Sequence, residues 1–409
     1  MSATVSPSHS IAVPTVATAL LPIMAAVSLA FLVIGVALPV LPLHVHQKLG
    51  LSTFVVGLIT GTQFLAALMS RVWAGRFADR AGAKRAVVVG MLTAVAGGLL
   101  YLLSLLCVAT PAVSAGILLL GRGLLGGAES FVITGGVSWG LALVGPTNAG
   151  RVIAWIGMAM FAALAFGAPI GTSLYALGGF TAIAVATAIV PLAAIALVAP
   201  LAAVPVQRGA RTSLLKVARA VWMPGIGSAL SSIGLGAMIA FSSLLAAERQ
   251  WSPVWLFFSV FAAALVVARL FLGHVPDRLG GARVALVSVL IEAGGLLLIW
   301  LAPAQIFGVA GALLTGLGFA LVYPGLGVEA VRRAPPESRG VAMGAYTAFL
   351  DLALGFGSPA LGWIAGWAGL GSVFLAGALI VSGATAFAAR LLCSGSGRGP
   401  LKIGRAETK

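Results

Sequence analysis

The chain has 409 residues, of which 60% are hydrophobic and 8% are charged, and its formal net charge is +15. Because soluble domains carry about a quarter charged residues, this composition excludes a water-soluble globule and indicates a multi-pass membrane protein. A positive charge of this size favours nucleic-acid binding in a soluble protein. Here the basic residues recur between apolar segments, so we expect a lipid bilayer and no nucleic acid as the partner.

Twelve apolar runs follow one another along the chain. A span needs about 20 apolar residues, and an isolated strand in lipid would leave its backbone unsatisfied, so we interpret each run as a helix. The runs are, roughly, 16–42, 52–74, 84–108, 112–142, 149–177, 180–205, 219–247, 253–273, 283–302, 304–331, 339–366 and 369–393.

These runs predict an all-α integral membrane protein with two six-helix bundles, at 16–205 and 219–393. The remaining segments are an N-terminal tail at 1–15, a polar central loop at 206–218 and a C-terminal tail at 394–409. The first ten residues contain no Lys or Arg. Since a secretory signal begins with a positively charged region, we expect the first run to be a retained span.

The basic residues gather at alternate junctions between runs, for example from Arg71 to Arg85, from Arg208 to Arg219, and after Arg390. Only Lys48 and Arg249 fall in the other set of junctions. Positively charged loops stay in the cytoplasm. This predicts a bacterial inner-membrane protein with both termini and the central loop in the cytoplasm.

A charged, glycine-containing stretch occurs twice, as RVWAGRFADRAGAKR at 71–85 and as RLFLGHVPDRLGGAR at 269–283. Six residues recur at a constant offset of 198 positions, and we interpret both stretches as loops. A repeat of this period predicts two related halves. The matched residues are Arg71, Gly75, Asp79, Arg80, Gly82 and Arg85 with Arg269, Gly273, Asp277, Arg278, Gly280 and Arg283.

The first stretch resembles the loop between helices 2 and 3 of the major facilitator superfamily (MFS) of secondary transporters. The resemblance covers nearly the whole chain and is strongest to efflux-type members, including the YhhS/YfcJ-like group. It implies an MFS fold of twelve helices in two pseudo-symmetric bundles. A small-molecule substrate would then bind near the membrane midplane, between the bundles.

The resemblance also implies that the two repeated stretches form a cytoplasmic latch. Asp79 would face the start of run 11, and Asp277 the start of run 5, where a carboxylate is stabilised by the helix dipole. The second copy departs from the family pattern at His274 and Pro276. The alternative is that both aspartates are turn residues beside arginines that set the topology.

Run 4 contains two ionisable residues, Arg122 and Glu129, in the sequence LLLGRGLLGGAES. Seven positions separate them, so they share a helix face about two turns apart. Run 4 resembles the family helix whose arginine often serves substrate or proton binding, and we expect both residues to face one polar cavity. The alternative is that both lie near membrane ends and extend to the interface.

Two further acids lie in apolar runs, Asp351 in run 11 and Glu292 in run 9. An ionisable residue inside the membrane is a functional candidate. For Asp351 a proton-binding role and a structural role both remain open. For Glu292 we favour a structural role because run 9 is peripheral in this fold.

Gly167, Pro169 and Gly171 resemble the glycine–proline antiporter signature of run 5, where the halves meet. Gly357 and Pro359 repeat the same pattern in run 11. The alternative is that these small residues only promote close helix packing.

Several other patterns are weak. A Gly-x-Ser-x-Gly match at Ser138 would suggest an intramembrane hydrolase, but its histidine base is missing from mid-membrane. His44 and His46 lack the further ligands that a metal site needs. No ATP-binding P-loop pattern occurs. We therefore expect a non-enzyme without metal or cofactor, driven by an ion gradient.

We expect proton-coupled efflux of a drug, sugar or metabolite by alternating access, with a monomer as the working unit. Glu129 and Asp351 are the proton-site candidates. The first alternative is a proton-coupled importer or a uniporter of a sugar or metabolite. A non-transporting receptor and the hydrolase are alternatives of other classes.

Overall fold

The computed structural model describes residues 16–145, 148–204, 214–334 and 339–395. These parts of the chain are helical and contain no strand. The elements are α1 (Val16–Ala37), α2 (Leu41–Leu43), the π-helical turn η1 (His44–Lys48), α3 (Thr53–Ala81), α4 (Ala83–Leu106), α5 (Pro111–Val144), α6 (Ala149–Val198), α7 (Leu214–Glu248), α8 (Leu256–Leu272), α9 (Val275–Leu279), α10 (Gly281–Leu301), α11 (Gln305–Arg333), α12 (Arg339–Ala368) and α13 (Gly371–Gly395).

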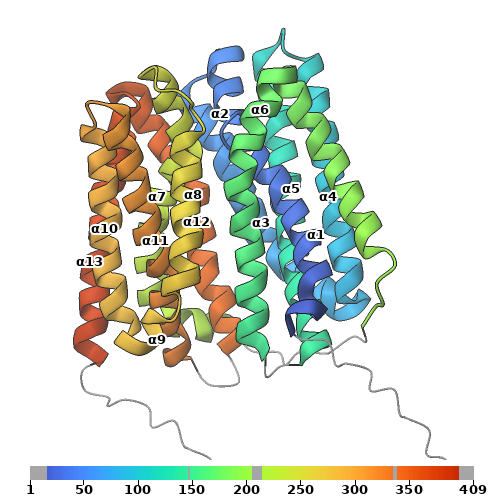
Figure 1. The fold of residues 1–409 in the computed structure, drawn as a ribbon, viewed down its shortest axis with the longest axis vertical. Helices are drawn as coiled ribbons and strands as arrows, with labels where there is room; N and C mark the ends of the chain where they lie inside the picture. Colours follow the sequence, from blue (N-terminus) through green and yellow to red (C-terminus); the bar gives the residue numbers. More distant parts are fainter. Residues whose placement is uncertain (1–15, 146–147, 205–213, 335–338, 396–409) are drawn as a thin grey trace, which may run out of the picture.

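The helices form two bundles side by side, α1–α6 and α7–α13 (Figure 1). We call them the N half and the C half. The halves meet mainly through two helix pairs, α3 with α12 and α6 with α8. Helix α1 begins and α13 ends at the lower end of Figure 1, which we call the terminal face. The other end is called the opposite face.

The expected twelve-helix fold is confirmed. Ten helices in the described ranges are long and apolar enough to cross a membrane. One of these, α6, bends back at Gly178 and Gly179, where the backbone leaves helical geometry, and it therefore supplies two spans. Gly179 has φ 61°, a conformation that only glycine adopts readily. The shorter apolar helix α8 completes the twelve.

The expectation of a loop from Arg71 to Arg85 is wrong. Helix α3 continues to Ala81, and only Gly82, with φ 98°, separates it from α4. In the second copy, Arg269 lies inside α8, the short helix α9 holds Asp277, and Gly280, with φ 93°, precedes α10. Arginine and alanine are good helix formers, so the charged residues after Arg71 continue α3 instead of ending it.

The α3–α12 interface is closed near the opposite face. A Cβ atom on Gly57 or Gly61 would overlap backbone atoms of α12. The Thr53 hydroxyl also donates a hydrogen bond of 2.7 Å to the carbonyl of Gly362. Small residues therefore allow the halves to touch backbone to backbone at this end.

Candidate functional site

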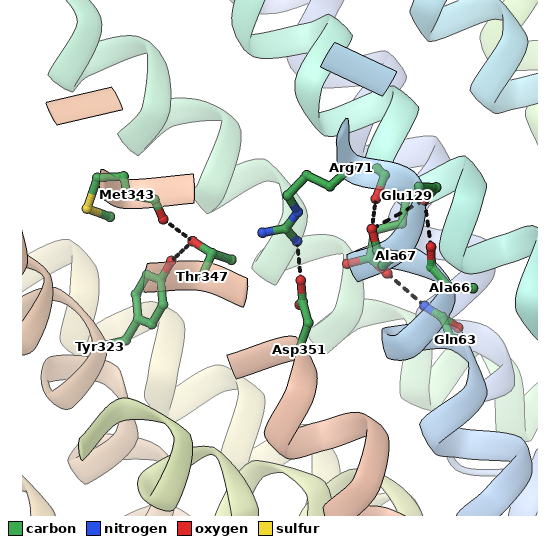
Figure 2. Close-up of polar contacts among 11 residues, drawn as sticks. Gln63, Ala66, Ala67, Arg71, Glu129, Tyr323, Met343, Thr347 and Asp351 are labelled. Atoms are coloured by element: carbon green, nitrogen blue, oxygen red, sulfur yellow. Dashed lines mark hydrogen bonds and ion pairs between the residues drawn. The ribbon is translucent and has the colours of Figure 1, made fainter. Parts of the chain in front are cut away.

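An ion pair joins the halves at the middle of the α3–α12 interface. Nη2 of Arg71 lies 2.5 Å from Oδ2 of Asp351 (Figure 2). The Asp351 side chain is 3% exposed and that of Arg71 is 26% exposed. The contact is close but poorly aligned as a hydrogen bond. Among the residues that the structure describes, it is the one ion pair between the halves.

A second carboxylate, Glu129 of α5, lies on the other side of Arg71. Nε2 of the buried Gln63 donates a hydrogen bond of 2.9 Å to Oε2 of Glu129. Arg71 attracts both Glu129 and Asp351 electrostatically, and the two carboxylates interact with each other. Arg71 is therefore ion-paired with a carboxylate of the other half and lies within electrostatic range of a carboxylate in its own half.

Close packing of α5 on α3 fixes this arrangement. Gly126 brings the backbone of α5 against the carbonyl of Gln63, where a Cβ atom would not fit. The Ser130 hydroxyl donates a hydrogen bond of 2.6 Å to the carbonyl of Ala67. Gln63 and Arg71 lie about two turns apart on α3. Glu129 and Arg71 are thus held by packed helices of one half, whereas Asp351 belongs to the other half.

The pseudo-symmetric counterpart of Arg71 is Arg269 of α8. Its guanidinium carbon lies 4.2 Å from the ring centre of Phe161, on α6 of the N half, and 5.7 Å from that of Tyr323, on α11. Its Nε donates a hydrogen bond of 3.4 Å to the carbonyl of Ala320. We expected Arg71 and Arg269 only as the first residues of two loops. The repeat itself was the signal that could have identified them as paired interface residues.

The predicted run-4 pair is split between two neighbours. Arg122 is 1% exposed and lies beside Tyr101 of α4, and its Nε and Nη1 have no hydrogen-bond partner within the described ranges. Glu129 instead turns toward Gln63 of α3. The two residues still interact electrostatically.

Glu292 is fully buried inside the C half. The Ser231 hydroxyl of α7 donates a hydrogen bond of 2.5 Å to its Oε2. Gly234 of α7 leaves room for the carboxyl, and Gly318 of α11 leaves room for the backbone nitrogen and Cβ of Glu292. Glu292 therefore lies away from the interface that holds Asp351.

The predicted latch residues lie near the terminal face. Asp79, Arg80, Asp277 and Arg278 are exposed. Neither aspartate forms an ion pair with any residue that the structure describes. The aspartates were expected to face the starts of runs 11 and 5; residues 335–338 before α12 and residues 146–147 before α6 lie outside the described residues.

The family model described as the Major Facilitator Superfamily matches residues 23–257 and 225–405. The chain belongs to this superfamily. The expectation from the repeated motif is thereby confirmed, and the protein is a multi-pass membrane transporter with a small-molecule substrate.

Two similar relatives are bacterial. One, from Salmonella typhimurium, is an uncharacterized MFS-type transporter that is 43% identical over 354 residues, covering 86% of this chain and 91% of the relative. Another, from Burkholderia mallei, is also described as an uncharacterized MFS-type transporter. It is 41% identical over 367 residues, covering 87% of this chain and 88% of the relative.

Solved structures share the MFS fold. A bacterial homolog of the human lysosomal transporter Spinster, inward-facing and unoccupied, has a TM-score of 0.73 at 16% identity, covering 93% of this chain and 98% of that chain. The nucleoside transporter NupG has a TM-score of 0.71 at 15% identity, covering 92% of this chain and 98% of the NupG chain.

The glycine–proline motifs of this MFS chain have different neighbours in the two halves. Gly167 and Gly171 pack against α1 within the N half, rather than against the C half as we expected for this motif. In α12, Gly357 packs against α7, while Pro359 meets Gly57 and Gly61 of α3 across the interface. The α12 motif therefore contributes to the contact between the halves through Pro359, whereas the two glycines of the α6 motif pack within the N half.

The Gly-x-Ser-x-Gly match is a helical segment. Ser138 lies inside α5, which is continuous from Pro111 to Val144. A nucleophile elbow needs a sharp turn between a strand and a helix, so this stretch does not have the geometry of a hydrolase site.

Proposed function

We propose that this protein is a proton-coupled exporter of a small organic solute, in which Arg71 exchanges between Asp351 and Glu129. The observation that carries the proposal is the single arginine shared by two carboxylates on opposite sides of a moving interface. Ionisable residues inside a membrane are costly, and they commonly mark substrate or proton pathways.

Protonation of Asp351 would neutralise one partner of the interface ion pair. Arg71 would then be attracted only by Glu129, within its own half, and α12 would lose its charged contact with α3 at this level. Loss of the proton would restore the pair. The two protonation states of one residue would thereby favour two arrangements of the halves, which is the requirement for coupling proton movement to alternating access.

The distribution of basic residues supports an orientation in the membrane. Exposed basic side chains gather on the terminal face, including Arg76, Arg85 and Arg283, whereas Lys48 and Arg249 lie toward the opposite face. By the positive-inside rule the terminal face is cytoplasmic. We place the protein in the bacterial inner membrane, with both termini inside and a monomer as the working unit.

The described conformation is closed near the opposite face, where Thr53 bonds to Gly362. Near the terminal face, Asp79 and Asp277 are exposed and form no latch with described residues. We therefore interpret the structure as inward-facing, and we propose that these two aspartates make their helix contacts in the outward-facing state.

The test uses inside-out vesicles that are acidified by respiration and monitored with a pH dye. Separate pools of organic acids, sugars, neutral metabolites and cationic drugs are added. Proton release that depends on the protein identifies both antiport and the substrate pool. Asp351→Asn should abolish this release yet retain exchange of labelled for unlabelled substrate, since the neutral side chain mimics the protonated state.

Glu292→Gln is the matched control, because it also removes a buried membrane acid but lies within one half. It should keep proton release near the level of the parent protein. Equal loss in both variants would contradict a specific role of Asp351. Substrate movement without proton release in the parent protein would instead indicate uniport, and proton uptake together with the substrate would indicate import.

A further inference from the structure

The two arginine contacts between the halves are related by the internal repeat. Arg71 and Arg269 are 198 positions apart. Asp351 and Phe161 are 190 positions apart, the same offset that relates Pro169 to Pro359. The residue that faces Arg269 is thus the counterpart of the carboxylate that faces Arg71. The same helix contact is ionic in one interface and aromatic in the other.

Arg269 has no carboxylate partner within the described ranges. No acidic side chain of α6, α11 or α12 within the described ranges pairs with it. Its electrostatic neighbours are instead the phenols of Tyr323 and Tyr346. The Ala320 carbonyl accepts from Nε, and neither terminal nitrogen has a hydrogen-bond acceptor among the described residues. A guanidinium presents five N–H donors, so most of them are available to a ligand.

The surroundings of Arg269 suit an anion attached to an apolar body. The rings of Phe161 and Tyr323 lie against the guanidinium. The Tyr323 hydroxyl lies 2.7 Å from Oγ1 of Thr347, and Tyr346 donates a hydrogen bond of 2.8 Å to the Tyr323 carbonyl. The fork of donors fits a carboxylate in two-point contact, and the aromatic faces would pack against an apolar or planar group.

Tyr323 connects this region with the ion pair. It interacts electrostatically with Arg269 on one side and with Arg71 and Asp351 on the other. Figure 2 shows Tyr323 and Thr347 on the C-half side of the Arg71–Asp351 contact. A ligand bound at Arg269 would therefore lie between the halves, where their rocking changes its access.

We propose that Arg269, Phe161 and Tyr323 form a recognition site for the carboxylate of an organic anion with an apolar or aromatic body. This inference deepens the proposed function, on which it rests for the transport step. Arg71 has its counterion supplied by the chain, whereas the counterion of Arg269 is the transported solute. The interface that carries the proton and the interface that carries the substrate are then two copies of one helix contact.

The experiment measures binding to the purified full-length protein in detergent, without any transport step. Thermal unfolding is followed with benzoate, with its neutral analogue benzamide, with benzylammonium, and with chloride and sulfate. Benzoate should raise the unfolding temperature in a saturable way, and the other four compounds should not. Arg269→Gln should weaken benzoate binding by about tenfold or more, since the charge-assisted contact is lost.

Phe161→Asp provides a second variant that does not remove the arginine. It copies the Arg71–Asp351 arrangement and supplies an internal carboxylate, so it should abolish the benzoate effect while the protein remains folded. Arg249→Gln is the matched control for the arginine variant. The Arg249 guanidinium carbon also lies over an aromatic ring, 4.9 Å from the ring centre of Trp251, but outside the proposed site, so benzoate binding should stay within a few-fold of the parent protein.

Three binding results would overturn the inference. The first is that benzamide stabilises the protein as much as benzoate does. The second is that folded Arg269→Gln and Phe161→Asp bind benzoate with unchanged affinity. The third is that chloride or sulfate stabilises the protein and blocks benzoate, which would mean that the site holds an adventitious ion only. Failure of the proposed function is distinguishable: benzoate would bind in detergent, but no solute would exchange with protons in vesicles. Proton exchange with neutral or cationic solutes alone would contradict only this inference.

Discussion

The α3–α12 and α6–α8 interfaces are built from the same repeat, yet they differ at the residue opposite the arginine. In the first, Arg71 meets Asp351, with Glu129 within electrostatic range. In the second, Arg269 lies over Phe161. A carboxylate can gain and lose a proton and an aromatic ring cannot, so only the first interface can respond directly to protons.

The difference also explains how one fold could separate two tasks. The proposed proton-sensitive contact and the proposed anion contact lie in separate helix pairs, which would move together if the halves rock. Competition between a proton and a substrate would then act through this shared movement, with no need for both to occupy one residue. Breaking either contact should therefore affect the two tasks to different extents.

Arg71→Asp should have the largest effect, because it places three carboxylates together in the middle of the interface. Like charges at this distance destabilise the closed contact, and we expect proton-coupled transport to fall to background. Exchanging the two residues, as Arg71→Asp with Asp351→Arg, should recover part of the transport. Vesicle assays at equal protein levels provide the measurement, and no recovery in the double variant would argue against a direct pair.

Gly57→Ala should have the next largest effect, through packing rather than charge. Its new methyl group would overlap the carbonyl of Ser358, and overpacking costs about 1–3 kcal/mol. Thermal unfolding should show this loss, and the opposite face should become accessible to thiol reagents. Gly75→Ala is the matched control, since a Cβ atom there has no neighbour within 4 Å. Equal effects would contradict the tight contact between the halves.

Glu129→Gln should have an intermediate effect on transport. The hydrogen bond to Gln63 can be kept by an amide, but the charge that attracts Arg71 after protonation of Asp351 is lost. We expect proton-coupled flux to fall by about tenfold, corresponding to about 1.4 kcal/mol, with substrate exchange preserved. A variant with unchanged flux at every external pH would remove Glu129 from the mechanism.

Lys84→Met should have the smallest effect, since it touches neither interface. The Lys84 ammonium donates hydrogen bonds of 2.6 Å to the carbonyls of Ala199 and Leu201, at the end of α6. Removing these bonds should lower the free energy of unfolding by about 1 kcal/mol and leave transport nearly unchanged. A strong transport defect without loss of stability would assign Lys84 a role in the moving parts.

The sequence was sufficient to predict the twelve spans, the two related halves and the membrane acids. Hydropathy and the repeat carry this information because both are visible along the chain without knowing which helices meet. The partner of each ionisable residue could not be predicted, because it depends on which helices meet. Arg71 is the clearest case: it was placed in a loop because it opens the repeated charged stretch, whereas α3 carries it into the interface.

The same limit applies to Arg269 and Glu129. Nothing in the run that contains Arg269 shows that a ring from the other half will face it. For Glu129, the spacing to Arg122 correctly describes one helix, but the nearest partner is Gln63 on another helix. Roles for the latch and for the membrane acids remain predictions.

The most direct test of the central claim measures the distance between α3 and α12 as a function of pH. Spin labels are placed at two exposed sites near the terminal face, Arg76 and Gly344, after Cys107 and Cys393 are replaced by alanine. The account predicts that acidification shifts the distance distribution. It also predicts that Asp351→Asn shows the low-pH distribution at every pH. A distribution that ignores pH, or an Asp351→Asn variant that still responds to pH like the parent protein, would contradict the claim that this ion pair couples protons to the movement of the halves.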